Sequence, residues 1–258
     1  MGTPFTAFLG PSDLSAYDAT KSLSSQSSSV PKTFLDAMEV REQVFVQEQG
    51  VPAESEFDTD DPRSCHWVIY ASINSVTSPE EIDAKGNITK LKESTTRATP
   101  IGTIRLVPFP HFAHPEPGSK FVFSPEEAAA GPPTYIVDRK TSYHDGIEPY
   151  LKLGRLAVIK EFRGSGMAKI LANAALTWAR ENPTFFNPSV AEVGMENLRA
   201  ESIEEVPVWN GLICVHAQEQ VEKAWAKWGF KVDEGMGTWD EEGMIHVGMF
   251  QRLEFDKR

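Results

Sequence analysis

The chain has 258 residues, 40% of them hydrophobic, and its 25 Lys and Arg against 37 Asp and Glu give a formal net charge of −12. This acidic balance argues against broad contact with nucleic acid, because neutralising phosphates needs clustered Lys and Arg. No stretch approaches the roughly 20 apolar residues of a membrane span, and residues 1–11 lack the features of a secretory signal. The two cysteines, Cys65 and Cys214, fit a reducing compartment, with a single disulfide as the alternative. We therefore expect a cytoplasmic protein without membrane or nucleic-acid partners.

The first 30 residues are rich in serine and poor in large apolar side chains. They predict a flexible segment over 1–30, ahead of a single domain over 31–258. A helix is expected to begin at Pro31 and to end at Gly50. Apolar residues recur at helical spacing along one face of this helix, and Arg41 is the single polar member of that face. The face consists of Phe34, Ala37, Met38, Arg41, Val44 and Phe45.

Segments rich in β-branched and aromatic residues predict strands further along the chain. They lie at 65–71, 101–107, 151–159 and 212–217, and two more flank a turn at 240–243. Three intervening segments show no clean period and predict insertions, at 72–98, 108–149 and 184–209. The second insertion is dense in Pro and Gly and includes a short expected helix at 125–130. A loop of this length predicts a lid or a substrate wall.

The clearest helix begins at Met167 and ends at Asn182. Another helix follows the strand at 212–217 and is expected to end at Gly229. Because strands and helices alternate in the middle of the chain and a hairpin closes it, we expect an α/β (α+β) fold. Its mixed sheet should carry helices on both faces.

The most informative motif is the run Arg-Gly-Ser-Gly-Met-Ala, which follows the strand at 151–159 and opens the clearest helix. It consists of Arg163, Gly164, Ser165, Gly166, Met167 and Ala168. The glycines let the backbone pass close to a ligand, and the first amides of a helix lack intrahelical partners and favour anions. Arg163 adds a planar cation suited to phosphate. The motif predicts a pyrophosphate cradle, with an ordinary strand-to-helix turn as the alternative. It lacks the Gly-Lys-Ser/Thr ending of a P-loop, and Lys169 replaces the small residue of a dinucleotide fingerprint.

The run Leu-Gly-Arg-Leu-Ala-Val at 153–158, together with the cradle, resembles the acyl-CoA motif of the GNAT superfamily of N-acyltransferases. Further segments resemble its ElaA-like branch, in order along the chain: 41–52, 56–61 with His66, 101–106, 217–230 and 240–249. The resemblance covers most of 30–253 outside the insertions. It implies the GNAT fold, with the central strands splayed between Ile159 and Leu212 and the acyl-CoA arm in that gap.

The resemblance also implies that acetyl-CoA is the acyl donor and that an amine attacks its thioester directly. Leu156, Ala157 and Val158 are expected to pair with the pantetheine arm, and the cradle residues with the pyrophosphate. The alternative is that the three strand residues only pair with a neighbouring strand. The family often places a tyrosine, as the acid for the thiolate, where this chain has Trp225. An indole N–H is not a proton source. Tyr135, Tyr143, Tyr150 or the amine itself are the alternatives.

The base that removes the amine proton has several candidates. Because the segment around residue 48 walls the substrate side of this fold, and because imidazole titrates near neutrality, we rank His216, Glu48 and His246 first. The other candidates are Asp58, Asp60, Asp61 and His66, or a water chain.

The expected function is transfer of the acetyl group to a small primary amine such as an amino sugar or polyamine. The alternatives are an acyl-CoA-binding module without catalysis and a protein lysine acetyltransferase. We expect no metal, because no Cys or His pair has the spacing of a four-ligand zinc site. Related proteins often dimerise, which makes a homodimer a further expectation.

Overall fold

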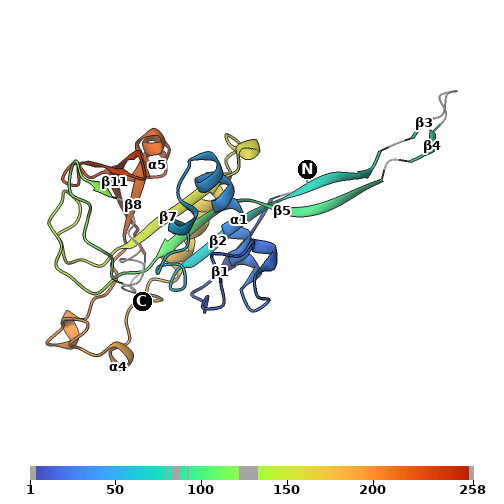
Figure 1. Ribbon diagram of the computed structural model, residues 1–258. Helices are drawn as coiled ribbons and strands as arrows, with labels where there is room; N and C mark the ends of the chain where they lie inside the picture. Colours follow the sequence, from blue (N-terminus) through green and yellow to red (C-terminus); the bar gives the residue numbers. More distant parts are fainter. Residues whose placement is uncertain (1–3, 80, 83–87, 92, 122–132, 256–258) are drawn as a thin grey trace.

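The structure is a computed structural model, which describes residues 4–79, 81–82, 88–91, 93–121 and 133–255. Its main sheet has the strand order β1-β2-β5-β7-β8-β11-β10-β6, with β9 paired to β11 (Figure 1). The strands of this sheet are β1 Phe5–Leu9, β2 Cys65–Ser78, β5 Glu93–Val107, β6 Lys120–Phe121, β7 Leu151–Val158, β8 Leu212–Gln218, β9 Lys231–Val232, β10 Thr238–Glu241 and β11 Met244–Arg252. The pairs β7–β8 and β6–β10 are parallel and the others antiparallel. The expected mixed sheet is confirmed.

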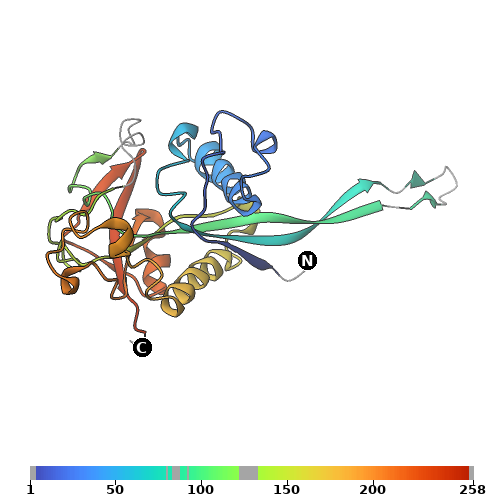
Figure 2. The same cartoon turned by 90° about the horizontal axis from the view of Figure 1, so that it is seen from below.

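Helices cover both faces of this sheet. Helix α1 (Lys32–Arg41) lies on one face and helix α3 (Met167–Glu181) on the other, as Figure 2 shows. A π-helical turn, Glu42–Glu48, continues α1, and α5 (Glu222–Lys227) contacts β8 and β9. Helix α4 (Val190–Val193) lies in the third insertion. No helix of the described residues is long and apolar enough to cross a membrane.

The first insertion is an extension of two strands of the sheet. Strands β2 and β5 stay paired from Cys65 opposite Leu106 out to Ser78 opposite Glu93, and form a ribbon that leaves the body of the molecule (Figure 1). Two short strands, β3 (Glu81–Ile82) and β4 (Ile88–Lys90), pair near its tip. The helix expected at 125–130 in the second insertion lies outside the described residues.

The N-terminal segment differs from the flexible stretch expected over 1–30. Strand β1 pairs antiparallel with β2 along the edge of the sheet. Leu14 and Val30 are buried and pack against Phe34 and Met38 of α1. The buried side chains of Leu14 and Val30 therefore anchor this otherwise largely exposed segment to the first helix.

A buried cluster of ion pairs joins the elements around α1, and we call it the ion cluster. Its members are Arg41, Glu56, Asp58, Asp61, Arg105 and Arg155. Arg41, the polar residue on the apolar face of α1, is 1% exposed. Its Nε lies 2.9 Å from Oε2 of Glu56, and its Nη1 lies 2.8 Å from Oδ1 of Asp61. Arg105 of β5 donates to the same Asp61 oxygen at 2.7 Å. The cluster therefore ties the helix and the sheet to the loop at 56–61.

Charge pairing in this cluster outweighs the cost of burial for the carboxylates. Burial by itself raises the pKa of Asp61, but the guanidinium groups of Arg41 and Arg105 together hold it well below its usual range. Asp58 behaves in the same way, with Arg105 and Arg155 as its partners. Both carboxylates are therefore ionised at neutral pH and already paired with cations.

We expect Arg41→Ala to destabilise the protein strongly, because it removes the buried cation that Glu56 and Asp61 share and leaves the ion cluster with one uncompensated negative charge. Removing one member of a buried pair costs about 3–5 kcal/mol of unfolding free energy. Urea denaturation followed by circular dichroism measures this loss. The control is Lys21→Ala, which breaks an exposed pair with Asp18 and should leave the denaturation midpoint unchanged. Equal midpoints for Arg41→Ala and wild type would show that the cluster does not hold the fold.

Candidate active site

Strands β7 and β8 separate in the middle of the sheet. They pair in parallel only over residues 151–153 and 213–215. Beyond Leu153, Ala157 and Val158 pair with β5 on one edge, and no strand of the described residues pairs with their other edge. The separation implied by the family resemblance is therefore present, and the free edge belongs to residues expected to meet the acyl donor.

A β-bulge causes this separation. Gly154 and Ala157 pair with Arg105 and Thr103, so that Arg155 and Leu156 both lie opposite the single intervening residue of β5. The φ angle of Arg155 is 50°, in the left-handed region that a non-glycine residue adopts only at a cost of roughly 1–2 kcal/mol. A bulge bends its strand and increases its twist. Strand β7 therefore turns away from β8 at this point.

The ion cluster holds the bulge in place. Nη2 of Arg155 lies 3.1 Å from Oδ2 of Asp58 and 3.4 Å from the carbonyl oxygen of Ser55. Its Nε lies 3.6 Å from Oε1 of Glu56. These contacts fix the side chain of the strained residue, so the loop at 53–61 sets the shape of the central gap.

The cradle follows directly after β7. Gly164 and Gly166 have φ angles of 77° and 87°, and a Cβ at either position would meet nothing within 4 Å. Helix α3 starts after Gly166 without a side-chain cap. Within the described hydrogen bonds, the backbone amides of residues 164–166 have no acceptor. Open space beside free amide donors fits an anion, as the pyrophosphate cradle requires.

Arg163 is fixed at the edge of the cradle. Its Nε donates to the carbonyl oxygen of Val158 at 2.9 Å, and its Nη2 lies 2.6 Å from Oε2 of Glu48. Glu48 was ranked among the candidate bases, but here its carboxylate is the counter-ion of the cradle arginine. An incoming phosphate would compete with Glu48 for this guanidinium group.

The other two candidate bases share one face of the sheet. Strand register puts His216 of β8 opposite Gly248, and His246 of β11 opposite both Gln218 and Trp239. The ring of His216 meets Trp239 edge-on at 4.7 Å, and its Nε2 is buried without a hydrogen-bond partner among the described residues. Burial holds the pKa of His216 well below its ordinary value, so its imidazole is neutral at pH 7. Nδ1 of His246 donates to the carbonyl oxygen of Met244 at 2.9 Å.

Glu241 is a polar residue of this face that the sequence analysis treated only as part of a turn. Its Oε2 accepts a hydrogen bond from Nε1 of Trp239 at 3.2 Å. Burial raises its pKa, but Lys152 and His246 together outweigh burial and lower the pKa, so the carboxylate is ionised. The period-2 alternation from Trp239 could have placed Glu241 beside the histidines.

The remaining candidates from the acidic loop have structural partners. Asp58 and Asp61 belong to the ion cluster, and Asp60 pairs with Arg63 at 2.6 Å. His66 is buried, and its Nε2 donates to the carbonyl oxygen of Asp61 at 2.9 Å. These contacts give the loop at 56–61 a structural role beside the gap between β7 and β8.

Comparison with known proteins decides the family. The profile of the acetyltransferase (GNAT) family matches residues 53–202. The chain belongs to the GNAT family of acetyltransferases. It is an N-acyltransferase, and its acyl donor is acetyl-CoA.

Several solved structures are similar over nearly the whole chain. A protein from Lactobacillus plantarum assigned as an N-acetyltransferase has 18% identity and a TM-score of 0.49, over 98% of this chain and 100% of that one. Escherichia coli ElaA has 13% identity and a TM-score of 0.47, over 97% and 100%. An acyl-CoA N-acyltransferase from Pseudomonas aeruginosa has 13% identity and a TM-score of 0.45, over 96% and 99%. No curated protein matches the sequence.

The GNAT tyrosine position holds a core residue here. Trp225 is buried and packs edge-on against Trp228 and Phe230 at about 5 Å. Of the tyrosines considered instead, Tyr143 is 43% exposed. Tyr150 is buried, and burial raises its pKa well above its ordinary value. Tyr150 therefore holds its proton more tightly than an ordinary phenol. Cys65 and Cys214 are both buried and free, so the alternative of a disulfide is wrong.

We expect Gly164→Glu and Gly166→Glu to abolish acetyl-CoA binding, because each adds a negative side chain in the open space beside the amides. Isothermal titration of the folded variants with acetyl-CoA measures the loss. Gly118→Glu is the matched control, since Gly118 has a φ of 74° and open space around its Cβ but lies in the second insertion. Unchanged affinity in either cradle variant would show that the donor binds elsewhere.

We expect Glu48→Gln to bind acetyl-CoA several-fold more tightly than wild type, because a competitor for Arg163 is removed. Its turnover should stay within a few-fold of wild type. Isothermal titration with acetyl-CoA tests the affinity, and initial rates test the turnover. A turnover loss of about 100-fold would instead mark Glu48 as the base.

Proposed function

We propose that the protein transfers the acetyl group of acetyl-CoA to a small primary amine, with His216 as the proton acceptor. The observation that carries the proposal is the gap between β7 and β8, which has the cradle at the end of one strand and a neutral histidine with an unpartnered nitrogen on the other. One side of the gap binds the donor, and the other side faces the amine.

The chain supplies two groups for holding the donor. The free edge of β7 at Leu156, Ala157 and Val158 has the geometry for pairing with an amide-containing arm, as an added strand would. The amides of the cradle and the guanidinium group of Arg163 then meet the phosphates. A backbone N–H on the free edge is also positioned to polarise the thioester carbonyl.

The face with the two histidines supplies groups for the amine. An alkylammonium ion must lose a proton before its nitrogen can attack. His216 is neutral at pH 7, and its Nε2 is buried without a hydrogen-bond partner among the described residues. In the tautomer protonated at Nδ1, this nitrogen accepts the proton. The ionised carboxylate of Glu241 attracts a cationic substrate to the same face. These charges favour a small amine over an acidic or neutral acceptor.

The second insertion favours a small acceptor over a protein lysine. It packs on the face of β8 and β11 through His114 and His144, whose rings contact Tyr150 and Phe250. A peptide substrate needs an open groove beside the gap. Dimer formation and a cytoplasmic location stay predictions of the sequence analysis.

Release of free CoA thiol tests the proposal directly. The purified chain is mixed with acetyl-CoA and a panel of polyamines, amino sugars and lysine-containing peptides, and thiol release is followed over time. Release with a polyamine or amino sugar supports the proposal. Release with the peptides alone would overturn the substrate class, and binding of acetyl-CoA without release would favour an acyl-CoA-binding module.

We expect His216→Gln to lower the maximal rate about 100-fold while leaving acetyl-CoA affinity unchanged. Because the pKa of His216 lies well below its ordinary value, His216 titrates below the pH range in which activity is measured. The acidic limb of the pH profile should therefore keep its position in the variant and report the amine. His246→Gln is the matched control on the same face and should lose less activity. A His216 variant with the wild-type rate would favour a water chain as the base.

A further inference from the structure

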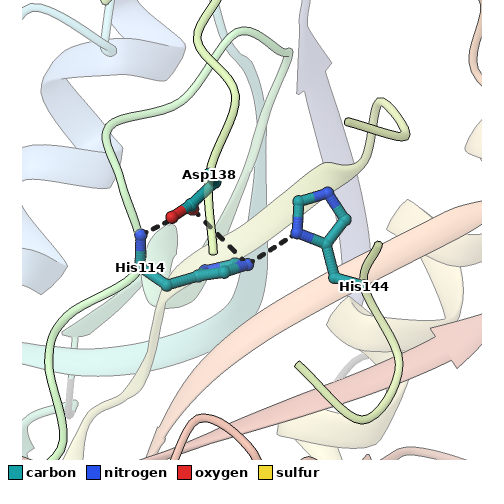
Figure 3. A group of neighbouring side chains, drawn as sticks. All are labelled: His114, Asp138 and His144. Atoms are coloured by element: carbon teal, nitrogen blue, oxygen red, sulfur yellow. Dashed lines mark hydrogen bonds and ion pairs between the residues drawn. The ribbon is translucent and has the colours of Figure 1, made fainter. Parts of the chain in front are cut away.

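Three potential metal ligands from distant positions meet inside the second insertion. Figure 3 shows the imidazole of His144 facing Nε2 of His114, with the carboxylate of Asp138 beside the same nitrogen. Nε2 of His114 lies 2.9 Å from Nδ1 of His144 and 3.8 Å from Oδ2 of Asp138. All three ligand atoms lie within 4.8 Å of one another. His114 and His144 are 3% and 5% exposed, so the group lies inside the protein.

Hydrogen bonds orient His144 and Asp138 toward this point. Nε2 of His144 lies 2.9 Å from the carbonyl oxygen of Glu148 and must donate to it, which leaves the Nδ1 lone pair directed at His114. The Asp138 oxygens accept from the backbone amides of His114 and Arg139, each at 2.7 Å. A histidine that donates one nitrogen to a carbonyl group and keeps a lone pair on the other has the usual arrangement of a metal ligand.

His114 is not satisfied by these contacts. Its Nδ1 is buried without a partner among the described residues. When Nε2 of His114 binds an ion, Nδ1 carries the ring proton and stays without a partner, so this nitrogen is a cost of the site and not a ligand.

We propose that His114, Asp138 and His144 bind one divalent cation, with Zn²⁺ as the ion that fits best. Two nitrogens and one carboxylate oxygen are typical zinc ligands. Nitrogens on one tetrahedral zinc lie roughly 3.3 Å apart when each bond is about 2.0–2.1 Å. The two imidazoles therefore need to part by only a few tenths of an ångström to take an ion in place of the shared proton.

A small cavity gives room for a fourth ligand. It has a volume of about 50 Å³ and is lined in part by Asp138, His144 and Glu148. A cavity measured in this way needs roughly 10–15 Å³ to hold one water. The cavity therefore has space for a water ligand, and it lies against two of the three protein ligands.

The ion would fasten the insertion to the catalytic sheet. Within its described residues the insertion has little regular structure, and β6 is its single strand. His114 and His144 are 30 residues apart, and both rings pack against Tyr150 and Phe250. A cation between them would close this loop over the face that carries His216. A metal cross-link of this kind stabilises segments that are too small to form a hydrophobic core of their own.

Metal titration of the whole chain tests the site. The purified protein is stripped with a chelator, dialysed and titrated with ZnCl₂ in the presence of a competing chromophoric chelator. We expect one ion per chain with sub-micromolar affinity, and a higher unfolding temperature with the ion. His144→Gln and Asp138→Asn should each weaken binding about 100-fold or more. His111→Gln is the control, because His111 lies in the same insertion but its Nε2 donates to the carbonyl oxygen of Tyr150.

The proposal is overturned if the wild type takes up no zinc, or if both ligand variants bind it as tightly as wild type. If a ligand variant fails to fold, X-ray absorption at the zinc edge still tests the site, because that measurement uses the wild-type chain alone. A first shell of nitrogen and oxygen with two imidazoles supports the site, and a shell containing sulfur overturns it. Zinc uptake is independent of acetyl transfer, so its outcome does not depend on the proposed acceptor.

Discussion

The pairing of Asp58 with Arg105 and Arg155 is the interaction on which the active site depends. Arg105 lies on β5 and Arg155 on β7, so a single carboxylate spans the two strands at the bulge. The left-handed backbone of Arg155 would relax if its side chain were free. With the bulge fixed, β7 cannot run on beside β8 and the sheet stays open. Buried charge is thus used here to maintain a defect in a sheet.

In the function proposed above, donor and acceptor chemistry are separated across this opening. Strand β7 ends in the cradle, where the groups that meet the donor are backbone amides and one guanidinium group. Strand β8 and the hairpin β10–β11 carry His216, Glu241 and His246, whose side chains suit an amine. The side chains on the acceptor side can change without disturbing donor binding, because the donor is held mostly by main chain. This division suits a family whose members act on different acceptors.

Local pattern predicted the features that depend on neighbouring residues. Helical spacing predicted the buried face of α1, including Arg41, and the glycines predicted the open left-handed turn before α3. The pattern could not identify partners distant in the sequence. The ion pair of Glu48 with Arg163, 115 residues away, is one such partnership. His114 and His144 are 30 residues apart in the sequence, and only folding brings them together.

The charge balance of the ion cluster has an evolutionary consequence. Three guanidinium groups face three mostly buried carboxylates, so the cluster is neutral only as a whole. Replacing one arginine alone leaves a carboxylate without its counter-charge, and replacing one carboxylate alone leaves an arginine without its counter-charge. Descendants of this chain can therefore leave the arrangement only by changing opposite charges together. The six positions should drift as a block, while the exposed ribbon of β2 and β5 diverges freely around them.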